Sequence, residues 1–242
     1  MTLRLVFCQS SNGCDISVIH QLGGQMKGVS KASQPAAVRA YHMLERMVVT
    51  LDLPPGAITT EGALIEKIRL GRTPVREAIQ RLAWEGLIEI RPRAGLVIAP
   101  LDRADWPKVI DAREGVEILL ARSAARFATG PIARRFREAA IRMEQAVVKN
   151  SPLAFLDADK LLDETLAEAA DNPFAARLAA PLQTHSRRFW FRYHAGSGLA
   201  LAAEQHVRLI RAILELDAES AAREAGALMR LLKDYAEAAA RA

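Results

Sequence analysis

The sequence predicts a mainly α-helical protein with an N-terminal winged helix-turn-helix and a C-terminal antiparallel all-α helical bundle. Residues 36–100 contain three amphipathic segments followed by two short β-rich runs, which predict three helices plus a β-hairpin. From residue 101 onward, long stretches rich in Ala, Leu, Arg and Glu show almost no strand signal. We therefore expect a flexible leader over 1–35, a winged helix-turn-helix over 36–100 and a helical domain over 101–242.

Composition places the chain among globular proteins. Of its 242 residues, 50% are hydrophobic and 25% are charged. No apolar run approaches the ~20 residues of a membrane span, so we expect a cytoplasmic protein without a membrane partner. The net charge of +5 favours an anionic partner only mildly. Residues 36–100 carry 9 basic and 7 acidic side chains, so any argument for DNA depends on where those charges lie.

The leader contains both cysteines, Cys8 and Cys14, without a zinc-binding pattern around them. Its apolar stretches are too short and broken for a secretory signal. Met26 lies inside a Gly-, Ser- and Gln-rich stretch, and we hypothesise that it is the natural start. Mass spectrometry that finds peptides from residues 1–25 in the native protein would contradict this hypothesis.

The first half contains the signals of a helix-turn-helix with a wing. Helices are expected over 36–50, from Thr59 to about residue 68, and over 74–85. Thr73 is expected to cap the third helix, with Pro74 at its first position and Gly86 just after its end. The runs LIEI and LVIA flank residues 91–95 as a hairpin.

The third helix carries positive charge where a helix favours negative charge. Arg72 precedes its N-terminus and Arg76 lies in its first turn, so both oppose the helix dipole. A DNA phosphate at the N-terminus would remove the conflict. Gln80 lies four residues after Arg76, so both can reach base edges. The alternative is ordinary solvated surface charge. The candidate DNA-binding residues are Arg69, Arg72, Thr73, Arg76, Gln80, Arg91, Arg93 and Gly95.

The segments LDLPPGA and RTPVREAIQRLAWEGLIEIRPRAG resemble the DNA-binding domain of the GntR family of bacterial transcription regulators. The resemblance implies that Arg72, Thr73 and Arg76 contact operator DNA, and that the wing around Gly95 approaches the minor groove. The chain departs from the family at Gly62, where Arg is usual. It also has Arg69-Leu70-Gly71 where Gly-Val-Ser is usual, so Arg69 can replace the lost charge.

The second half is expected to form six helices with short connections, typical of an antiparallel bundle. Their expected ranges are 104–128, 131–149, 152–170, 174–195, 199–216 and 218–240. Residues 101–240 resemble the helical effector-binding domain of the FadR subgroup, called FCD. The matching features are Arg113, Glu117, Asp159, the LAEAADNP stretch, His206 and Asp217.

The FCD resemblance implies a divalent metal site made of one Asp and three His. The corresponding positions hold Asp159, Asp163, His206 and Leu228, so two of the expected histidines are replaced. Asp159 and Asp163 lie four residues apart on one helix face and can share an ion. Carboxylate oxygens favour Mg or Mn over Zn as the bound metal, and Ni is a further candidate. The alternative is a site that has lost its metal, with a carboxylate paired to an arginine or facing solvent.

The same resemblance implies that Arg113 helps to bind a carboxylate effector, which suits its planar fork. We expect Arg188 to join it, because the aromatic-rich segment around Arg188 could line the same cavity. Trp190 and Phe191 in that segment are, however, of a kind that more often belongs to the core.

These observations predict a homodimeric repressor that binds a pseudo-palindromic operator in double-stranded DNA and responds to a small organic acid. One alternative is a DNA-binding regulator that has lost effector sensing. Another is a metal-dependent enzyme using Asp159, Asp163 and His206. The sequence has no nucleophile elbow, P-loop, dinucleotide fingerprint or HExxH motif, so we expect no enzymatic activity.

Overall fold

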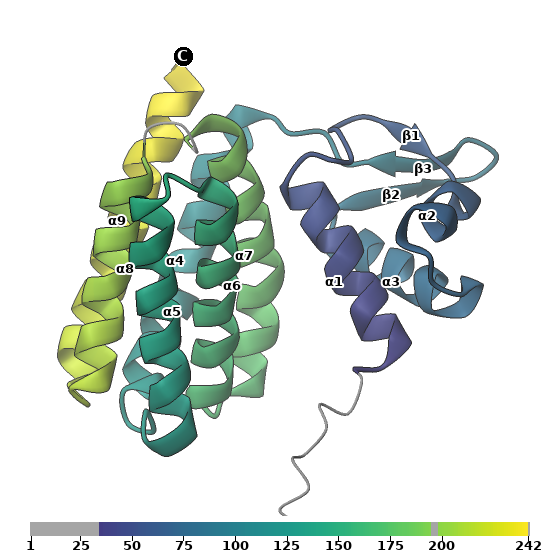
Figure 1. The fold of residues 1–242 in the computed structure, drawn as a ribbon. Helices are drawn as coiled ribbons and strands as arrows, with labels where there is room; N and C mark the ends of the chain where they lie inside the picture. Colours follow the sequence, from purple (N-terminus) through teal and green to yellow (C-terminus); the bar gives the residue numbers. More distant parts are fainter. Residues whose placement is uncertain (1–33, 195–197, 242) are drawn as a thin grey trace, which may run out of the picture. The chain divides into compact units, whose positions relative to one another are not determined.

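The computed structural model describes residues 34–194 and 198–241 (Figure 1). The two cysteines and Met26 lie outside the described residues. The elements of the first half are α1 (Ala36–Val49), β1 (Ile58–Thr59), α2 (Glu61–Ile68), α3 (Arg72–Trp84), β2 (Ile88–Arg91) and β3 (Gly95–Ile98). Those of the second half are the 3₁₀ turn η1 (Arg103–Asp105), α4 (Trp106–Ala124), α5 (Gly130–Val148), α6 (Pro152–Ala169), α7 (Pro173–Tyr193), α8 (Leu199–Leu214) and α9 (Ala218–Arg241). The predicted fold class is confirmed.

The first half contains a strand that the sequence did not predict. β1 pairs antiparallel with β3, so the sheet has the order β1-β3-β2 instead of being a plain hairpin. Thr59, expected to start the second helix, belongs to this strand. Thr60 is the actual N-cap of α2, and its hydroxyl accepts a hydrogen bond from the Ala63 N–H at 3.1 Å.

The helix-turn-helix has its own hydrophobic core. Helices α1 and α3 pack against each other through apolar residues at helical spacing. The inner residues of α3 are the ones that the sequence predicts, namely Val75, Ala78, Ile79 and Leu82. This packing leaves the opposite face of α3 in solvent.

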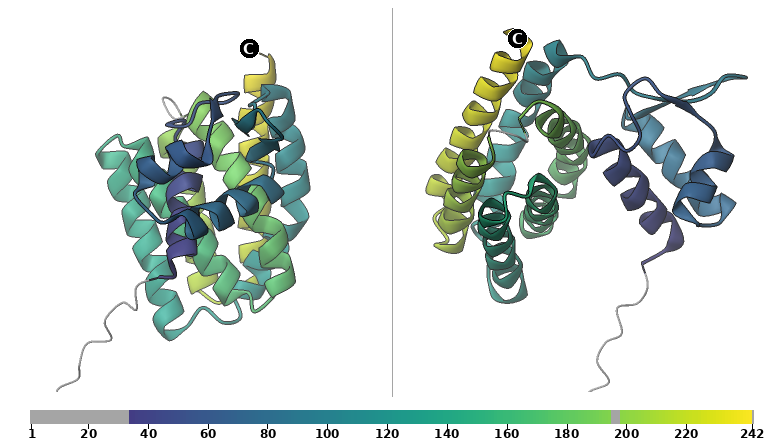
Figure 2. Two further views of the ribbon diagram at one scale, coloured as in Figure 1. Left: turned by 90° about the vertical axis from the view of Figure 1, so that its right-hand side faces the viewer. Right: turned by 45° about the horizontal axis from the view of Figure 1, so that its top comes forward.

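The six long helices α4–α9 lie alongside one another, and consecutive helices reverse direction (Figures 1 and 2). Helix α4 packs against both α7 and α9, while α5 packs against α6 and α8. A second hydrophobic cluster fills the space between them, built largely of alanine and leucine with Trp106, Phe136, Phe155, Phe189 and Trp190. Trp190 is therefore a core residue, as one of the two readings from the sequence expected. The expected boundary between the domains near residue 100 stays a prediction.

Residues 35–242 form one compact unit, within which α1 also contacts α7. The Thr184 hydroxyl of α7 donates to the Glu45 carboxylate of α1 at 2.8 Å. His185 contacts the Glu85 carbonyl through its Nε2 atom, also at 2.8 Å. These polar contacts bring side chains of the helical half against α1 and against the C-terminal end of α3.

Candidate functional site

The structure corrects the predicted N-terminus of α3. The helix begins at Arg72, its N-cap is Gly71, and no side chain caps it. Gly71 has an extended backbone, and its carbonyl accepts from the Val75 N–H at 3.3 Å. Thr73 therefore lies in the first turn and is not the cap. Pro74 also fits there, because first-turn N–H groups have no acceptor within the helix. The exposed start of α3 thus presents free N–H groups to an anion.

Arg76 is paired with a carboxylate that the sequence did not single out. Its Nε and Nη2 atoms donate to the two carboxylate oxygens of Glu61 at 3.1 and 3.2 Å. Arg72 lies beside the same group, with Nε 4.0 Å from Oε1. All three side chains are solvent-accessible, and the pairing is screened by water. Glu61 thus neutralises the arginines that oppose the α3 dipole, and a phosphate or base edge would have to take its place.

The other predicted residues of the helix-turn-helix are exposed, and Arg81 is exposed as well, but its guanidinium contacts α1 and the end of α3. Arg69 ends α2 in a left-handed conformation with φ of 54°, and Gln80 projects from the exposed face of α3. Arg81, which the pattern placed on that outer face, lies over the Tyr41 ring at 3.6 Å and donates to Glu85 at 2.9 Å. Its role is to join α3 to α1.

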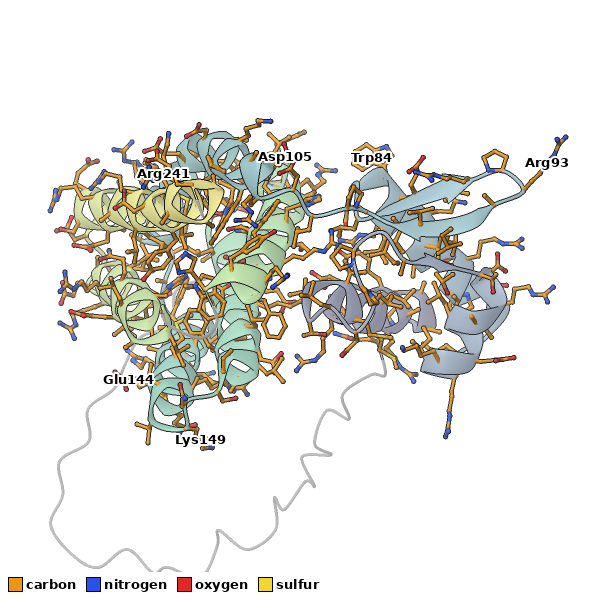
Figure 3. The ribbon with its side chains drawn as sticks, turned by 90° about the horizontal axis from the view of Figure 1, so that it is seen from above. Trp84, Arg93, Asp105, Glu144, Lys149 and Arg241 are labelled. Atoms are coloured by element: carbon orange, nitrogen blue, oxygen red, sulfur yellow. The ribbon has the colours of Figure 1, made fainter. Side chains whose placement is uncertain are left out.

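The wing presents arginines at the tip of the β2–β3 hairpin. Arg93 sits at the turn with φ of 65°, and Figure 3 shows its side chain pointing outward from the hairpin. Arg91 is exposed and donates to Glu89 at 2.8 Å. Gly95 has φ of 95°, and a Cβ there would lie 2.7 Å from the Thr59 carbonyl oxygen. Glycine is therefore needed for β1 to approach β3, independently of any DNA contact.

Arg113 in α4 is buried and already paired. Its Nε and Nη2 atoms donate to one oxygen of Glu117 at 3.0 and 2.8 Å. Gln183 from α7 donates to the same oxygen at 3.0 Å. An incoming carboxylate at Arg113 would therefore compete with Glu117.

Asp159 and Asp163 of α6 face a guanidinium from α7. Arg187 pairs with Asp163, and its Nη1 atom lies 3.5 Å from Asp159. His206 of α8 lies 3.0 Å from the other oxygen of Asp159, and its Nδ1 atom is 2.6 Å from the Ala202 carbonyl oxygen. All of these side chains are buried or nearly so.

The electrostatics of the two carboxyl groups differ. Burial opposes ionisation of Asp159, but the hydrogen bond and charge of His206 and the nearby Arg187 lower its pKa to about 2. Burial and the neighbouring Asp159 carboxylate raise the pKa of Asp163 above its ordinary value, against the effect of Arg187. Burial likewise opposes the charge of His206, yet Asp159 raises the pKa of His206.

The donor set does not fit the expected metal ion. Leu228, at the fourth position, is buried among apolar residues and offers no lone pair. Arg187 pairs with the Asp163 oxygen that a metal would need, and like charge excludes a cation from that place. Among the described residues, no group of three or more His, Cys, Asp or Glu side chains is arranged to hold a metal ion.

Arg188 lies apart from Arg113. Its Nη2 atom donates to the Ala99 carbonyl oxygen at 2.6 Å, just after β3. The side chain is fully buried, its Nε and Nη1 atoms find no partner among the described residues, and burial lowers its pKa to about 10. Arg187, and not Arg188, lines the small cavity that Arg113, Asp159, Ser186 and His206 share, whose volume is about 20 Å³.

The buried charges continue to a residue that sequence reasoning missed. Glu45 of α1 is 4% exposed, pairs with Lys160 and lies 3.6 Å from Arg187 Nη2. Its signal in the sequence was a glutamate at a position facing the core, next to the apolar Leu44 and Val48. Arg187 thus lies between Glu45 on one side and Asp163 on the other.

Two family models match the chain. Residues 36–98 match "Bacterial regulatory proteins, gntR family", and residues 108–231 match the FCD domain. The matches cover most of the chain, which therefore belongs to the GntR family of bacterial regulatory proteins and carries an FCD domain.

Relatives with names agree with this assignment. The fatty acid metabolism regulator protein of Edwardsiella ictaluri is 30% identical over 72% of this chain and 80% of that protein. The transcriptional repressor RspR of Escherichia coli K12 is 25% identical over 79% of this chain and 84% of that one. The solved structure of E. coli McbR/YncC has the same fold, with a TM-score of 0.70 at 17% identity, covering 81% of this chain and 94% of that one.

The chain is therefore a DNA-binding transcriptional regulator and not an enzyme. The metal-dependent enzyme considered from Asp159, Asp163 and His206 is overturned by the family, whose members are regulators. No helix in the described part of the chain is both long and apolar enough to cross a membrane.

Proposed function

We propose that the protein is a cytoplasmic repressor that binds, as a homodimer, a pseudo-palindromic operator through α3 and the wing. The observation that carries this proposal is the exposed start of α3, where free N–H groups, Arg72 and Arg76 converge. Two symmetry-related copies would present two such helices to half-sites of a palindrome. The repressor roles named for RspR and for the gluconate operon repressor of Bacillus subtilis support repression.

The proposed contacts divide by geometry. Arg72, Thr73 and the first N–H groups of α3 would hold a phosphate, because they surround the helix N-terminus. Arg76 and Gln80 lie about one and two turns further along the exposed face and would reach base edges in the major groove. Arg69 would support the backbone contact, while Arg91 and Arg93 at the wing would contact phosphates or enter the minor groove.

Operator binding is further proposed to respond to a small carboxylate at Arg113. The support is that this buried arginine lines a cavity together with Ser186, whose hydroxyl could offer a further polar contact, and with His206, whose two nitrogens already have partners. The carboxylate would replace Glu117 as the partner of Arg113, and the cavity would have to widen, because about 20 Å³ holds a single water. Such an effector acts on DNA binding only if it prefers one arrangement of the protein.

The alternative is a regulator that senses no effector. It is favoured by the same cavity, which is nearly filled, and by the internal pairing of Arg113 with Glu117. A thermal-shift screen of small carboxylic acids separates the two proposals. Stabilisation by one acid, lost in Arg113→Ala while DNA affinity stays, supports effector sensing. No stabilisation by any acid and an unchanged operator affinity support the alternative.

The DNA-binding proposal is tested on a duplex selected by the protein from a random pool. Fluorescence anisotropy should show specific binding with half-sites about one helical turn apart. The wild-type chain should protect both half-sites in a footprint. Binding of one chain to a site without symmetry would contradict the homodimeric arrangement, and a protein that selects no sequence would contradict the operator proposal.

A further inference from the structure

The FCD resemblance assigns Asp159 and Asp163 to a metal site. In this structure, the positive charge beside these two carboxylates is the guanidinium of Arg187. Arg187 pairs with Asp163 and lies 3.5 Å from Asp159, and its side chain is only 8% exposed. A guanidinium at this depth is well suited to bridge two carboxylates, because its five N–H groups spread over a planar fork.

We propose that Arg187 is the resident cation of this site, supplying from within the chain the charge that a divalent metal supplies in related domains, so that the folded protein needs no metal there. The proposal holds whether or not an effector binds.

Each carboxylate around Arg187 has a basic side chain beside it without an added ion. Asp163 faces Arg187, Asp159 faces His206, and Glu117 faces Arg113. A divalent cation placed among them would lie against the Arg187 guanidinium, and repulsion between like charges in a buried place is strong. Leu228 removes one of the four expected ligands, and Arg187 pairs with the Asp163 carboxylate that could otherwise bind a metal. Both features make the site less able to hold a metal.

An attached cation differs from a diffusible ion in what else it can touch. The Nη2 atom of Arg187 donates to the Thr184 hydroxyl at 3.1 Å and lies 3.6 Å from Glu45 in α1. A spherical ion bound only by α6 and α8 would not extend to that side. In this chain, the charge that stabilises the carboxylates of the bundle is therefore shared with the helix that supports α3.

The first experiment titrates the wild-type full chain, stripped with a chelator, with Mn²⁺, Ni²⁺ and Zn²⁺ by calorimetry and thermal shift. Asp159→Asn is the control, because it removes the proposed ligand while ions that bind elsewhere remain unaffected. The expected result is the same response in both proteins. One metal ion per wild-type chain, lost in Asp159→Asn, would overturn the proposal.

The second experiment compares Arg187→Met with Arg187→Lys. Arg187→Met removes the cation and should melt lower. A divalent ion at 100 times its dissociation constant should then raise its melting temperature by about 5–10 °C. Arg187→Lys keeps the charge and should show no metal response. An Arg187→Met protein that folds but takes up no metal would overturn the claim that the arginine holds the metal's place.

If Arg187→Met does not fold, the comparison remains informative. Folding that is restored by Mn²⁺ or Zn²⁺, or a Lys variant that folds where the Met variant does not, supports a requirement for a cation from residue 187. If neither variant folds, the proposal is tested by the titration of the wild type against Asp159→Asn, in which one metal ion per wild-type chain would overturn it.

Discussion

The arginines on the α3 surface and those inside the bundle differ in how deeply they and their carboxylate partners are buried. On α3, Arg72 and Arg76 share one carboxylate, Glu61, in a solvent-exposed pairing. In the bundle, Arg113 and Arg187 are buried, and each has an internal carboxylate partner. Exposed pairs exchange partners at little cost, whereas buried pairs hold a structure in place. The comparison indicates that the first set is available to DNA and that the second is built to stay together.

The largest expected effect comes from the buried side of this comparison. Glu45→Gln should lower the free energy of unfolding by about 3 kcal/mol at pH 7, because it leaves Lys160 without its buried carboxylate and removes one of the carboxylates around Arg187. Urea unfolding measures the difference. The control is Asp157→Asn, which breaks the exposed pair with Arg46 and should cost less than about 1 kcal/mol. Equal losses in the two variants would contradict a special role for Glu45.

The stability that Glu45→Gln loses relative to the wild type should depend on pH. Burial opposes ionisation of Glu45, but His42, Lys160 and Arg187 hold its pKa below the ordinary value of 4.5. A lowered pKa in the folded state means that the carboxylate stabilises the fold above pH 4.5 and that this contribution is lost as the pH falls further. The gap between wild type and Glu45→Gln should therefore shrink below pH 4.5. A gap that stays constant down to acid unfolding would rule out this linkage.

The next effect is on DNA. Arg76→Ala should weaken binding to the selected operator by roughly 5- to 150-fold and leave stability unchanged, because Arg76 is exposed and its partner Glu61 stays in water. Anisotropy on the operator and on a scrambled duplex measures both affinity and specificity. Arg208→Ala, an exposed arginine on α8, is the matched control. A loss of equal size on both duplexes would make Arg76 a phosphate contact.

The smallest expected effects on DNA affinity come from changes at residues 61 and 62, next to Arg76. Glu61→Gln should raise DNA affinity by a few fold, because Arg76 no longer exchanges a carboxylate for DNA. A weaker affinity in this variant would mean that Glu61 positions Arg76 for binding.

Gly62→Arg should also raise DNA affinity, since it restores the arginine that is usual in the family. A side chain fits there, because a Cβ at Gly62 meets only Thr60 Oγ1, at 3.8 Å. Gly62→Ala controls for the gain in helix propensity. Equal affinities for the two variants would show that residue 62 makes no DNA contact in this protein.

How much of this was predictable from sequence depended on whether the signal was local. The inner stripe of α3 and the Pro- and Gly-marked breaks between bundle helices are local patterns, and they predicted those elements closely. Strand β1 is only two residues long and exists because it pairs with β3. It is too short to show the alternation of apolar and polar residues that predicts a strand. The N-terminus of α3 was misplaced because Gly71 can start a helix without a capping side chain.

In the candidate sites too, local features could be predicted from the sequence, whereas pairings between distant residues could not. The exposed arginines of α3 stood out because they oppose the helix dipole, which is visible in sequence. The pairing of Arg187 with Asp163, and of Glu45 with Lys160, joins residues 24 and 115 positions apart. Sequence reasoning allowed for an arginine partner to the carboxylates but did not single out which one, and it expected Arg188 where the structure has Arg187.

The division between exposed and buried charge is tested most directly by the salt dependence of operator binding. The logarithm of affinity should be measured against the logarithm of salt concentration for the wild type, for Arg72→Ala/Arg76→Ala and for Arg113→Ala. We predict that the double variant loses affinity and that the magnitude of its slope is smaller by about 1–2, while Arg113→Ala matches the wild type. A wild-type slope in the double variant, or a loss as large in Arg113→Ala, would contradict it.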